Sequence, residues 1–180
     1  MTGVMVKKEF ILIIGFICWF LSLVLLLLRR KTKITKKIVR KKILQLILIE
    51  YILMVIGLTL MPIRIPPIAR DIPTCINLNV LDIFDYGLNR IAMINIFGNI
   101  LLFAPLPILL HLNGIKNIKL LYITLLILFC SIGIEFLQYL ETCFKFVYIA
   151  RTVDILDIIL NTLGAPIGYV VMKLYKINFD

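Results

Sequence analysis

Five apolar segments, each long enough to cross a lipid bilayer, constrain this chain more than any other feature of its sequence. About 20 residues at about 1.5 Å per residue span roughly 30 Å of hydrocarbon. Hydrophobic residues make up 62% of the chain, far above the usual share in a soluble domain. Because no β-barrel alternation occurs, the sequence predicts an all-α, polytopic helical membrane bundle with five transmembrane helices. The segments are residues 10–28, 43–61, 91–112, 120–140 and 153–174.

The first segment could also be read as a signal peptide, since Lys7 and Lys8 precede it. The apolar run is longer than a usual signal-peptide core, no small-x-small cleavage site follows, and three basic residues come directly after it. We therefore predict a retained span. Residues 1–42 would form an N-terminal transmembrane helix with a basic cytoplasmic loop, and residues 43–180 a four-helix membrane domain.

Nine of the 20 basic residues lie between positions 29 and 42, with no acidic residue among them. The positive-inside rule places this loop in the cytoplasm, which puts the N-terminus outside and the C-terminus inside. Only Lys7 and Lys8 oppose this orientation. Contact with anionic lipid explains the basic run more simply than nucleic-acid binding. We therefore expect membrane lipids, and no nucleic acid, as partners.

The last apolar segment carries a stripe of polar and small residues in place of leucine. The steps between them are 3, 3, 4, 3 and 4 residues, which predicts one face of an α-helix. Carboxylates and amides are costly in hydrocarbon unless they face a partner, a cavity or water. The stripe is therefore a candidate functional site. Its residues are Arg151, Asp154, Asp157, Asn161, Gly164 and Gly168.

Three of the predicted spans place polar residues at one depth, roughly 6 to 12 Å below the outer surface at about 1.5 Å per residue. These residues either bind a ligand or join the helices by hydrogen bonds. Helix joining fits the amides better than the carboxylates, since an Asn or Ser would join helices at lower desolvation cost. Arg151 can pair with a carboxylate or bind an anionic headgroup. The candidate ligand-binding residues are Asn95, Asn99, Glu135, Gln138, Arg151, Asp154, Asp157 and Asn161.

Two local features predict how the helices bend and pack. Pro105 and Pro107, near the middle of the third segment, remove two backbone donors, so a kink or break is expected there. Gly164 and Gly168 form a small-xxx-small step that lets another helix approach closely.

The four cysteines show no metal-binding spacing, and no nucleotide-binding or metalloprotease motif occurs. We therefore expect no metal site and no cofactor. Cys75 and Cys143 both fall on the predicted outer side, where they either form a disulfide or remain free thiols. The outer loop 62–90 is either a plain connector or an interfacial segment covering the polar layer.

The ordered series of polar residues resembles the VanZ-like family of bacterial membrane proteins. The resemblance spans roughly residues 76–171, although Pro107 stands where the family usually has glycine. The motifs that show it are Asn95-Ile-Phe-Gly98-Asn99, Phe103-Ala-Pro105, Glu135-Phe-Leu-Gln138 and Arg151-Thr-Val-Asp154-Ile-Leu-Asp157, followed by Asn161, Gly164 and Gly168.

The resemblance implies a bacterial cytoplasmic-membrane protein, of a family linked in some members to reduced susceptibility to glycopeptide antibiotics such as teicoplanin. With a polar layer on the outer side, we expect it to engage the antibiotic's lipid tail or a lipid-linked cell-wall precursor. The alternative is an intramembrane enzyme acting on a lipid or lipid-linked substrate, with Glu135 and Asp157 as acid–base or metal-binding pair. The sequence shows no nucleophile–base constellation, so binding is favoured. Five spans without an inverted repeat are few for a transporter.

Overall fold

The computed structural model describes residues 4–28, 35–69, 71–81 and 90–174. Five helical stretches in these ranges are long and apolar enough to cross a membrane, which confirms the predicted helical bundle. The helices are α1 (Lys8–Leu28), α2 (Lys36–Leu60), α4 (Arg90–Phe103), α5 (Pro105–Leu112), α6 (Leu120–Cys143) and α7 (Ile155–Leu174). Four short strands accompany them: β1 (Val4–Val6), β2 (Ile63–Ile65), β3 (Cys75–Asn77) and β4 (Thr152–Asp154).

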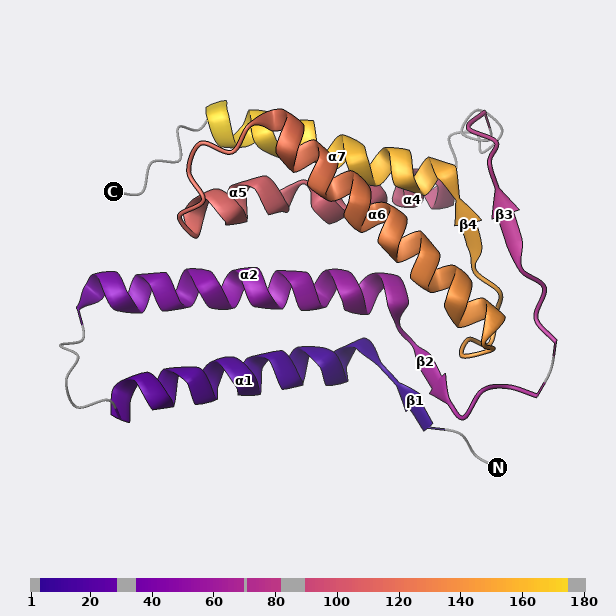
Figure 1. Ribbon diagram of the computed structural model, residues 1–180, viewed down its shortest axis with the longest axis horizontal. Coiled ribbons are helices and arrows are strands. Elements are labelled where there is room, and N and C mark those ends of the chain that lie inside the picture. The colour runs from indigo at the N-terminus through magenta and orange to yellow at the C-terminus, as the bar shows by residue number, and fades with distance from the viewer. Residues whose placement is uncertain (1–3, 29–34, 70, 82–89, 175–180) are drawn as a thin grey trace.

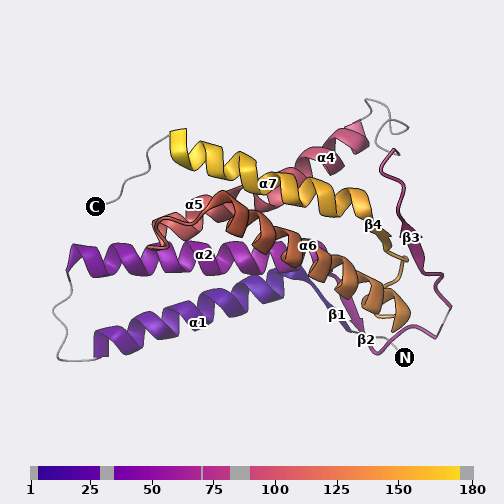
Figure 2. The same ribbon diagram turned by 45° about the horizontal axis from the view of Figure 1, so that its top comes forward.

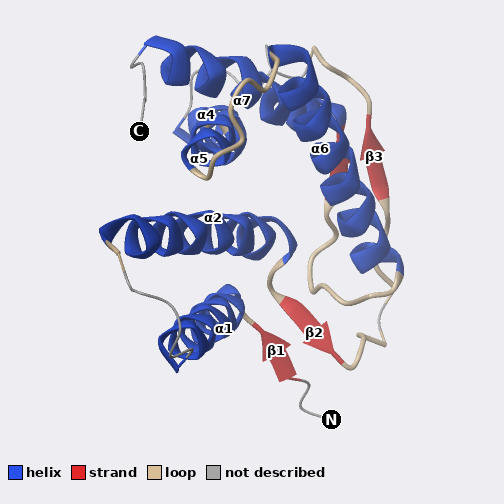
Figure 3. Ribbon diagram, turned by 60° about the vertical axis from the view of Figure 1, so that its left-hand side comes forward, coloured by secondary structure: helices blue, strands red, loops and turns tan. Residues whose placement is uncertain are grey.

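The helices form two groups, and α6 runs obliquely to α2 (Figure 1). Helices α1 and α2 lie side by side as an antiparallel hairpin, and α4, α5, α6 and α7 form the second group beside α2 (Figure 1). Helix α7 packs against α4, α5 and α6, whereas α2 meets this group through α5 and α6. Figure 3 shows α1 on the far side of α2 from α7. Helix α1 is therefore the peripheral member of the bundle.

All four strands lie at one end of the bundle, which we call the strand end (Figure 2). Strands β1 and β2 are antiparallel, with Val4 opposite Ile65, and β3 and β4 are parallel, with Asn77 opposite Asp154. The loop after β2 is tied to the loop after α6, since the Ile68 N–H donates to the Lys145 carbonyl at 2.9 Å. The predicted topology places the strand end outside the cell.

An ion pair on the surface adds to this contact between the two loops. Lys145 Nζ lies 2.7 Å from Asp71 Oδ1, and its hydrogen bond and charge lower the pKa of the Asp71 carboxyl group. The pair is exposed to solvent, so it positions the loop more than it stabilises the fold.

Helix α2 begins earlier than the sequence suggested. Its first residue is Lys36, so the basic residues from 36 to 42 are helical and do not belong to a loop. Lysine and arginine are good helix formers, and the Thr35 hydroxyl caps the helix by accepting from the Ile38 N–H at 3.4 Å. The rest of the predicted basic loop, residues 29–34, lies outside the described residues. We call the end of the bundle where α2 begins the basic end.

The predicted break in the third segment is confirmed. Helix α4 ends at Phe103 and α5 begins at Pro105, where a missing N–H is tolerated in the first helical turn. Tyr51 of α2 donates its hydroxyl to the Leu102 carbonyl at 2.6 Å, which fastens the last turn of α4 to α2. The break therefore lies where α2, α4 and α5 meet.

The glycines of α7 pack directly against this break, as their spacing predicted. A Cβ atom added to Gly164 would lie 2.5 Å from the Ile100 carbonyl oxygen, and one added to Gly168 would overlap the Ala104 carbonyl oxygen. Only glycine allows this approach of two backbones. The surrounding core consists of Tyr51, Val55, Phe103, Leu106, Ile123, Ile127 and Ala165.

All four cysteines are free in the structure, so Cys75 and Cys143 form no disulfide. The interfacial segment considered for the outer loop includes residues 82–89, which lie outside the described residues.

Candidate functional site

Polar residues from α2, α4, α6, α7, β3, β4 and the loop before β4 gather at the strand end, and they fall into two clusters. The Asp154 cluster consists of Asn77, Asn99, Glu135, Asp154 and Asp157. The Arg151 cluster consists of Thr59, Gln138, Glu141, Thr142 and Arg151. The two clusters include six of the eight candidate residues, all except Asn95 and Asn161, and the following distances define their contacts.

Asp154 joins three elements through three hydrogen bonds. Its Oδ2 accepts from Asn77 Nδ2 at 3.2 Å, a contact that follows from the register of β3 and β4. Its Oδ1 accepts from the Leu156 N–H at 2.8 Å, which caps the start of α7. Its own backbone N–H donates to Glu135 Oε2 at 3.1 Å. Glu135 itself is only 3% exposed.

Asp157, in the first turn of α7, is held by α4. Asn99 Nδ2 donates to Asp157 Oδ1 at 2.5 Å, so an amide and a carboxylate join these two helices. Asn95 lies one helical turn before Asn99 and is exposed. Its side chain makes no hydrogen bond to any described residue, so the structure places Asn95 beside the cluster and not within it.

Arg151 pairs with a carboxylate, but with one that the sequence reasoning did not name. Its Nε lies 3.5 Å from Glu141 Oε2, and its Nη1 donates to the Thr59 carbonyl. Gln138 Nε2 donates to the same carbonyl at 2.8 Å. The Thr142 hydroxyl accepts from the Arg151 N–H at 3.2 Å. The carbonyl groups of a last helical turn lack intrahelical partners, so Arg151 and Gln138 satisfy one at the end of α2.

Asn161 lies deeper in the bundle and joins two helices. Its Nδ2 donates to the Ser131 hydroxyl of α6 at 2.9 Å, and both residues are buried. Its Oδ1 accepts no hydrogen bond from a described residue. This contact matches the helix-joining role considered for the amides.

Two details of the predicted stripe are wrong. Arg151 precedes β4 and Asp154 ends it, so neither belongs to α7, and a short strand begins the segment in place of a helix. Pairing with β3 outweighs helix formation at these residues because it supplies backbone partners at the edge of the bundle.

Glu141 is the carboxylate of the Arg151 cluster that sequence reasoning missed, because the predicted fourth span ended at position 140. Helix α6 continues to Cys143, and Glu141 is 7% exposed. A signal was present: the polar residues of this helix follow steps of 4, 3 and 3 residues, which is a second stripe facing the first. That stripe consists of Ser131, Glu135, Gln138 and Glu141.

Acceptor groups outnumber cations in the two clusters. They contain one guanidinium, that of Arg151, and four carboxyl groups: those of Glu135, Glu141, Asp154 and Asp157. Among the described residues, no group of three or more His, Cys, Asp and Glu side chains is arranged to hold a metal ion. The arrangement suits a partner that presents hydrogen-bond donors.

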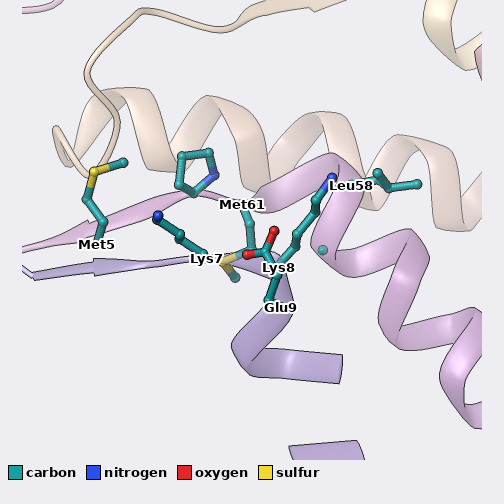
Figure 4. A pocket seen from close by; sticks show the side chains of 8 residues that line it. Met5, Lys7, Lys8, Glu9, Leu58 and Met61 are labelled. Carbon is teal, nitrogen blue, oxygen red and sulfur yellow. The ribbon is translucent and has the colours of Figure 1, made fainter. Parts of the chain in front are cut away.

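A hollow of about 290 Å³ lies at the strand end, where α1 begins and α2 ends. Figure 4 shows Lys7 and Lys8 extending in different directions, with the Glu9 carboxylate between them. Leu58 of the last turn of α2 and Met61, which directly follows the helix, supply an apolar wall. The last turn of α2 also contains Thr59, whose carbonyl accepts from Arg151. The hollow and the Arg151 cluster therefore share this turn.

The comparisons agree with this architecture. A family model described as VanZ/LLP1 matches residues 10–176, which include all the residues of both clusters. No curated protein and no solved structure matches the chain. Five candidate spans and a membrane family indicate a multi-pass membrane protein. Because the family match covers nearly the whole chain, the protein belongs to the VanZ/LLP1 family.

Proposed function

We propose that this protein lowers bacterial susceptibility to glycopeptide antibiotics of the teicoplanin type. It resides in the cytoplasmic membrane with the strand end outside. There it engages an amphiphile, either the lipid tail of the antibiotic or a lipid-linked cell-wall precursor. The main support is that carboxyl groups of α6, β4 and α7 converge at one end of a membrane bundle. Neutral pairs such as Asn161 and Ser131 join helices at lower desolvation cost, so joining alone does not account for the carboxyl groups.

The chemistry of the two clusters defines what such a ligand must present. Their surplus of carboxyl groups accepts hydrogen bonds from hydroxyl, amide or ammonium groups of the ligand. Asn95 is exposed beside them and adds an amide at the rim. The contacts of Arg151 to Thr59 and Glu141 use Nη1 and Nε, which leaves Nη2 to meet an anionic group of the ligand.

Removing either central carboxylate tests this proposal. Glu135→Gln and Asp157→Asn should each abolish the resistance phenotype, because a neutral amide keeps the shape but loses the charged acceptor. The measurement is the inhibitory concentration of teicoplanin in a susceptible host, with membrane-fraction immunoblots to show that each variant accumulates. Glu50→Gln is the control, since Glu50 lies on α2 away from both clusters. Full resistance in both site variants would contradict the proposal and show that these carboxylates have only a structural role.

Binding and catalysis lead to different products. Purified protein incubated with labelled antibiotic, or with a labelled lipid-linked precursor, should retain the ligand with its mass unchanged. A product of altered mass would favour the alternative, an intramembrane enzyme that uses Glu135 and Asp157.

The orientation has its own test. Cys75 and Cys143 are exposed at the strand end, so a membrane-impermeant maleimide should label both from outside intact cells. Cys18 and Cys130 lie near the middle of their spans and should stay unlabelled, whereas Cys143 is the last residue of its span. A reporter fused to the C-terminus should be active only in the cytoplasm. An externally exposed C-terminus would reverse the proposed topology.

A further inference from the structure

The basic end carries a hollow that the proposed function does not use. It has a volume of about 620 Å³ and lies between the first turns of α2 and the turn that follows α5. Four basic side chains line it, those of Lys36, Lys37, Arg40 and Lys41. Leu44 and Leu112 supply its apolar surface. None of the lining residues is acidic, and the sequence has no acidic residue from position 29 to 49.

The helix itself arranges these charges. Lys36 and Arg40 are four residues apart, as are Lys37 and Lys41, so each pair is stacked on neighbouring turns of α2. They lie at the N-terminal end of a 25-residue helix, where the macrodipole adds positive potential. The hollow therefore suits an anion.

Hydrogen bonds on two sides fix the walls of this hollow. Asn113 Nδ2 donates to the carbonyls of Leu44 at 3.0 Å and Leu109 at 2.9 Å, which ties the end of α5 to α2. On the opposite side, Trp19 Nε1 of α1 donates to the Lys42 carbonyl at 3.1 Å. The first turns of α2 are thus held between α1 and α5. The backbone that carries the basic side chains is therefore fixed in position.

A second hollow adjoins the first over the same turns of α2. Its volume is about 420 Å³, and it shares Lys36, Arg40 and Leu44 with the first. Val39 and Ile43 line it, and both are exposed. Charged and apolar side chains thus lie next to each other over the first turns of α2.

We propose that these joined hollows bind one anionic phospholipid of the adjacent leaflet. The lysines of the first hollow hold its phosphate, and Val39 and Ile43 contact its acyl chain. An amphiphile uses both the charged and the apolar parts of the surface. Single-stranded nucleic acid would use only the charges, since the lining residues include no aromatic side chain on which a base could stack. The site is separate from the Asp154 and Arg151 clusters and does not depend on the proposed function.

The test compares two charge-matched pairs of substitutions in the full-length protein. Lys37→Gln/Lys41→Gln removes two lysines from the hollow, whereas Lys116→Gln/Lys119→Gln removes two at the same end that do not line it. Native mass spectrometry after exchange into mixed phosphatidylglycerol and phosphatidylcholine vesicles measures the retained lipid. Wild type should retain phosphatidylglycerol. The first pair should weaken this retention by about 30-fold, from the usual contribution of two lysines near a membrane surface, and the second by less than about threefold.

A further variant and competing ligands distinguish a lipid site from a site that binds other anions. Lys37→Arg/Lys41→Arg keeps the charge and should keep the lipid, which would exclude misfolding as the cause of loss. Equal loss in both glutamine pairs, or equal retention of phosphatidylcholine, would overturn the proposal. Displacement of the lipid by inorganic phosphate at millimolar concentration would show an anion site without lipid preference, and would also overturn it. So would a short DNA oligonucleotide that binds in its place.

Discussion

Gly168→Ala should prevent the bundle from assembling correctly. The added Cβ atom would overlap the Ala104 carbonyl oxygen, which belongs to the backbone between α4 and α5 and cannot rotate away as a side chain can. Overpacking in a well-packed core costs about 1–3 kcal/mol, and a clash with backbone lies at or above the top of that range. We expect a loss of about 3 kcal/mol or more in the free energy of unfolding, measured by thermal unfolding in detergent micelles.

Two other glycines provide controls for this substitution. A Cβ atom added to Gly98 of α4 or Gly133 of α6 meets no atom within 4 Å. Gly98→Ala and Gly133→Ala should therefore leave stability unchanged or raise it slightly, because alanine favours helix more than glycine does. Similar destabilisation in all three variants would show that the loss at Gly168 is not caused by the close approach of α7 to the helix break.

Arg151→Met should be the most damaging substitution of a polar residue. It leaves the Glu141 carboxylate, 7% exposed, without its cation, and it removes the guanidinium donor from the Thr59 carbonyl. Breaking a buried ion pair from one side typically costs about 3–5 kcal/mol. We expect a loss of this size, together with poor accumulation in the membrane, measured by thermal unfolding and by immunoblot.

A second substitution separates the charge from the contact. In Arg151→Met/Glu141→Gln no unpaired carboxylate remains at this position, so the double variant should recover much of the lost stability. A double-mutant cycle with the two single variants gives the coupling energy. If the effects of the two substitutions simply add, Arg151 and Glu141 are not a coupled pair, and the Arg151 cluster is held by its hydrogen bonds to Thr59 and Thr142.

The sequence predicted the features that depend on local pattern. The apolar segments gave five spans, the prolines gave the break before Pro105, and the glycine spacing of α7 gave its close packing. Each of these is a property of neighbouring residues, such as a missing N–H at Pro105 or a missing Cβ at Gly168. The depth of each residue in the membrane follows only from counting residues along a helix, and it stays a prediction.

The sequence could not predict which polar residues touch. Counting gives the depth of a side chain but not the direction in which its helix faces, so Asn161 meets Ser131 while Asn95 stays exposed. The contact between Asn77 and Asp154 needs a parallel strand pair between segments 77 residues apart in sequence. Glu141 was missed because the predicted span ended at position 140, whereas α6 continues to Cys143.

Asp154 couples strand β3 to the start of the last helix. Its two carboxylate oxygens accept from different elements, Oδ2 from Asn77 of β3 and Oδ1 from the Leu156 N–H of α7, and its own N–H donates to Glu135. Any displacement of β3 relative to α7 therefore has to break or reorient contacts of this single side chain, so one aspartate fixes the position of β3 on the helical bundle.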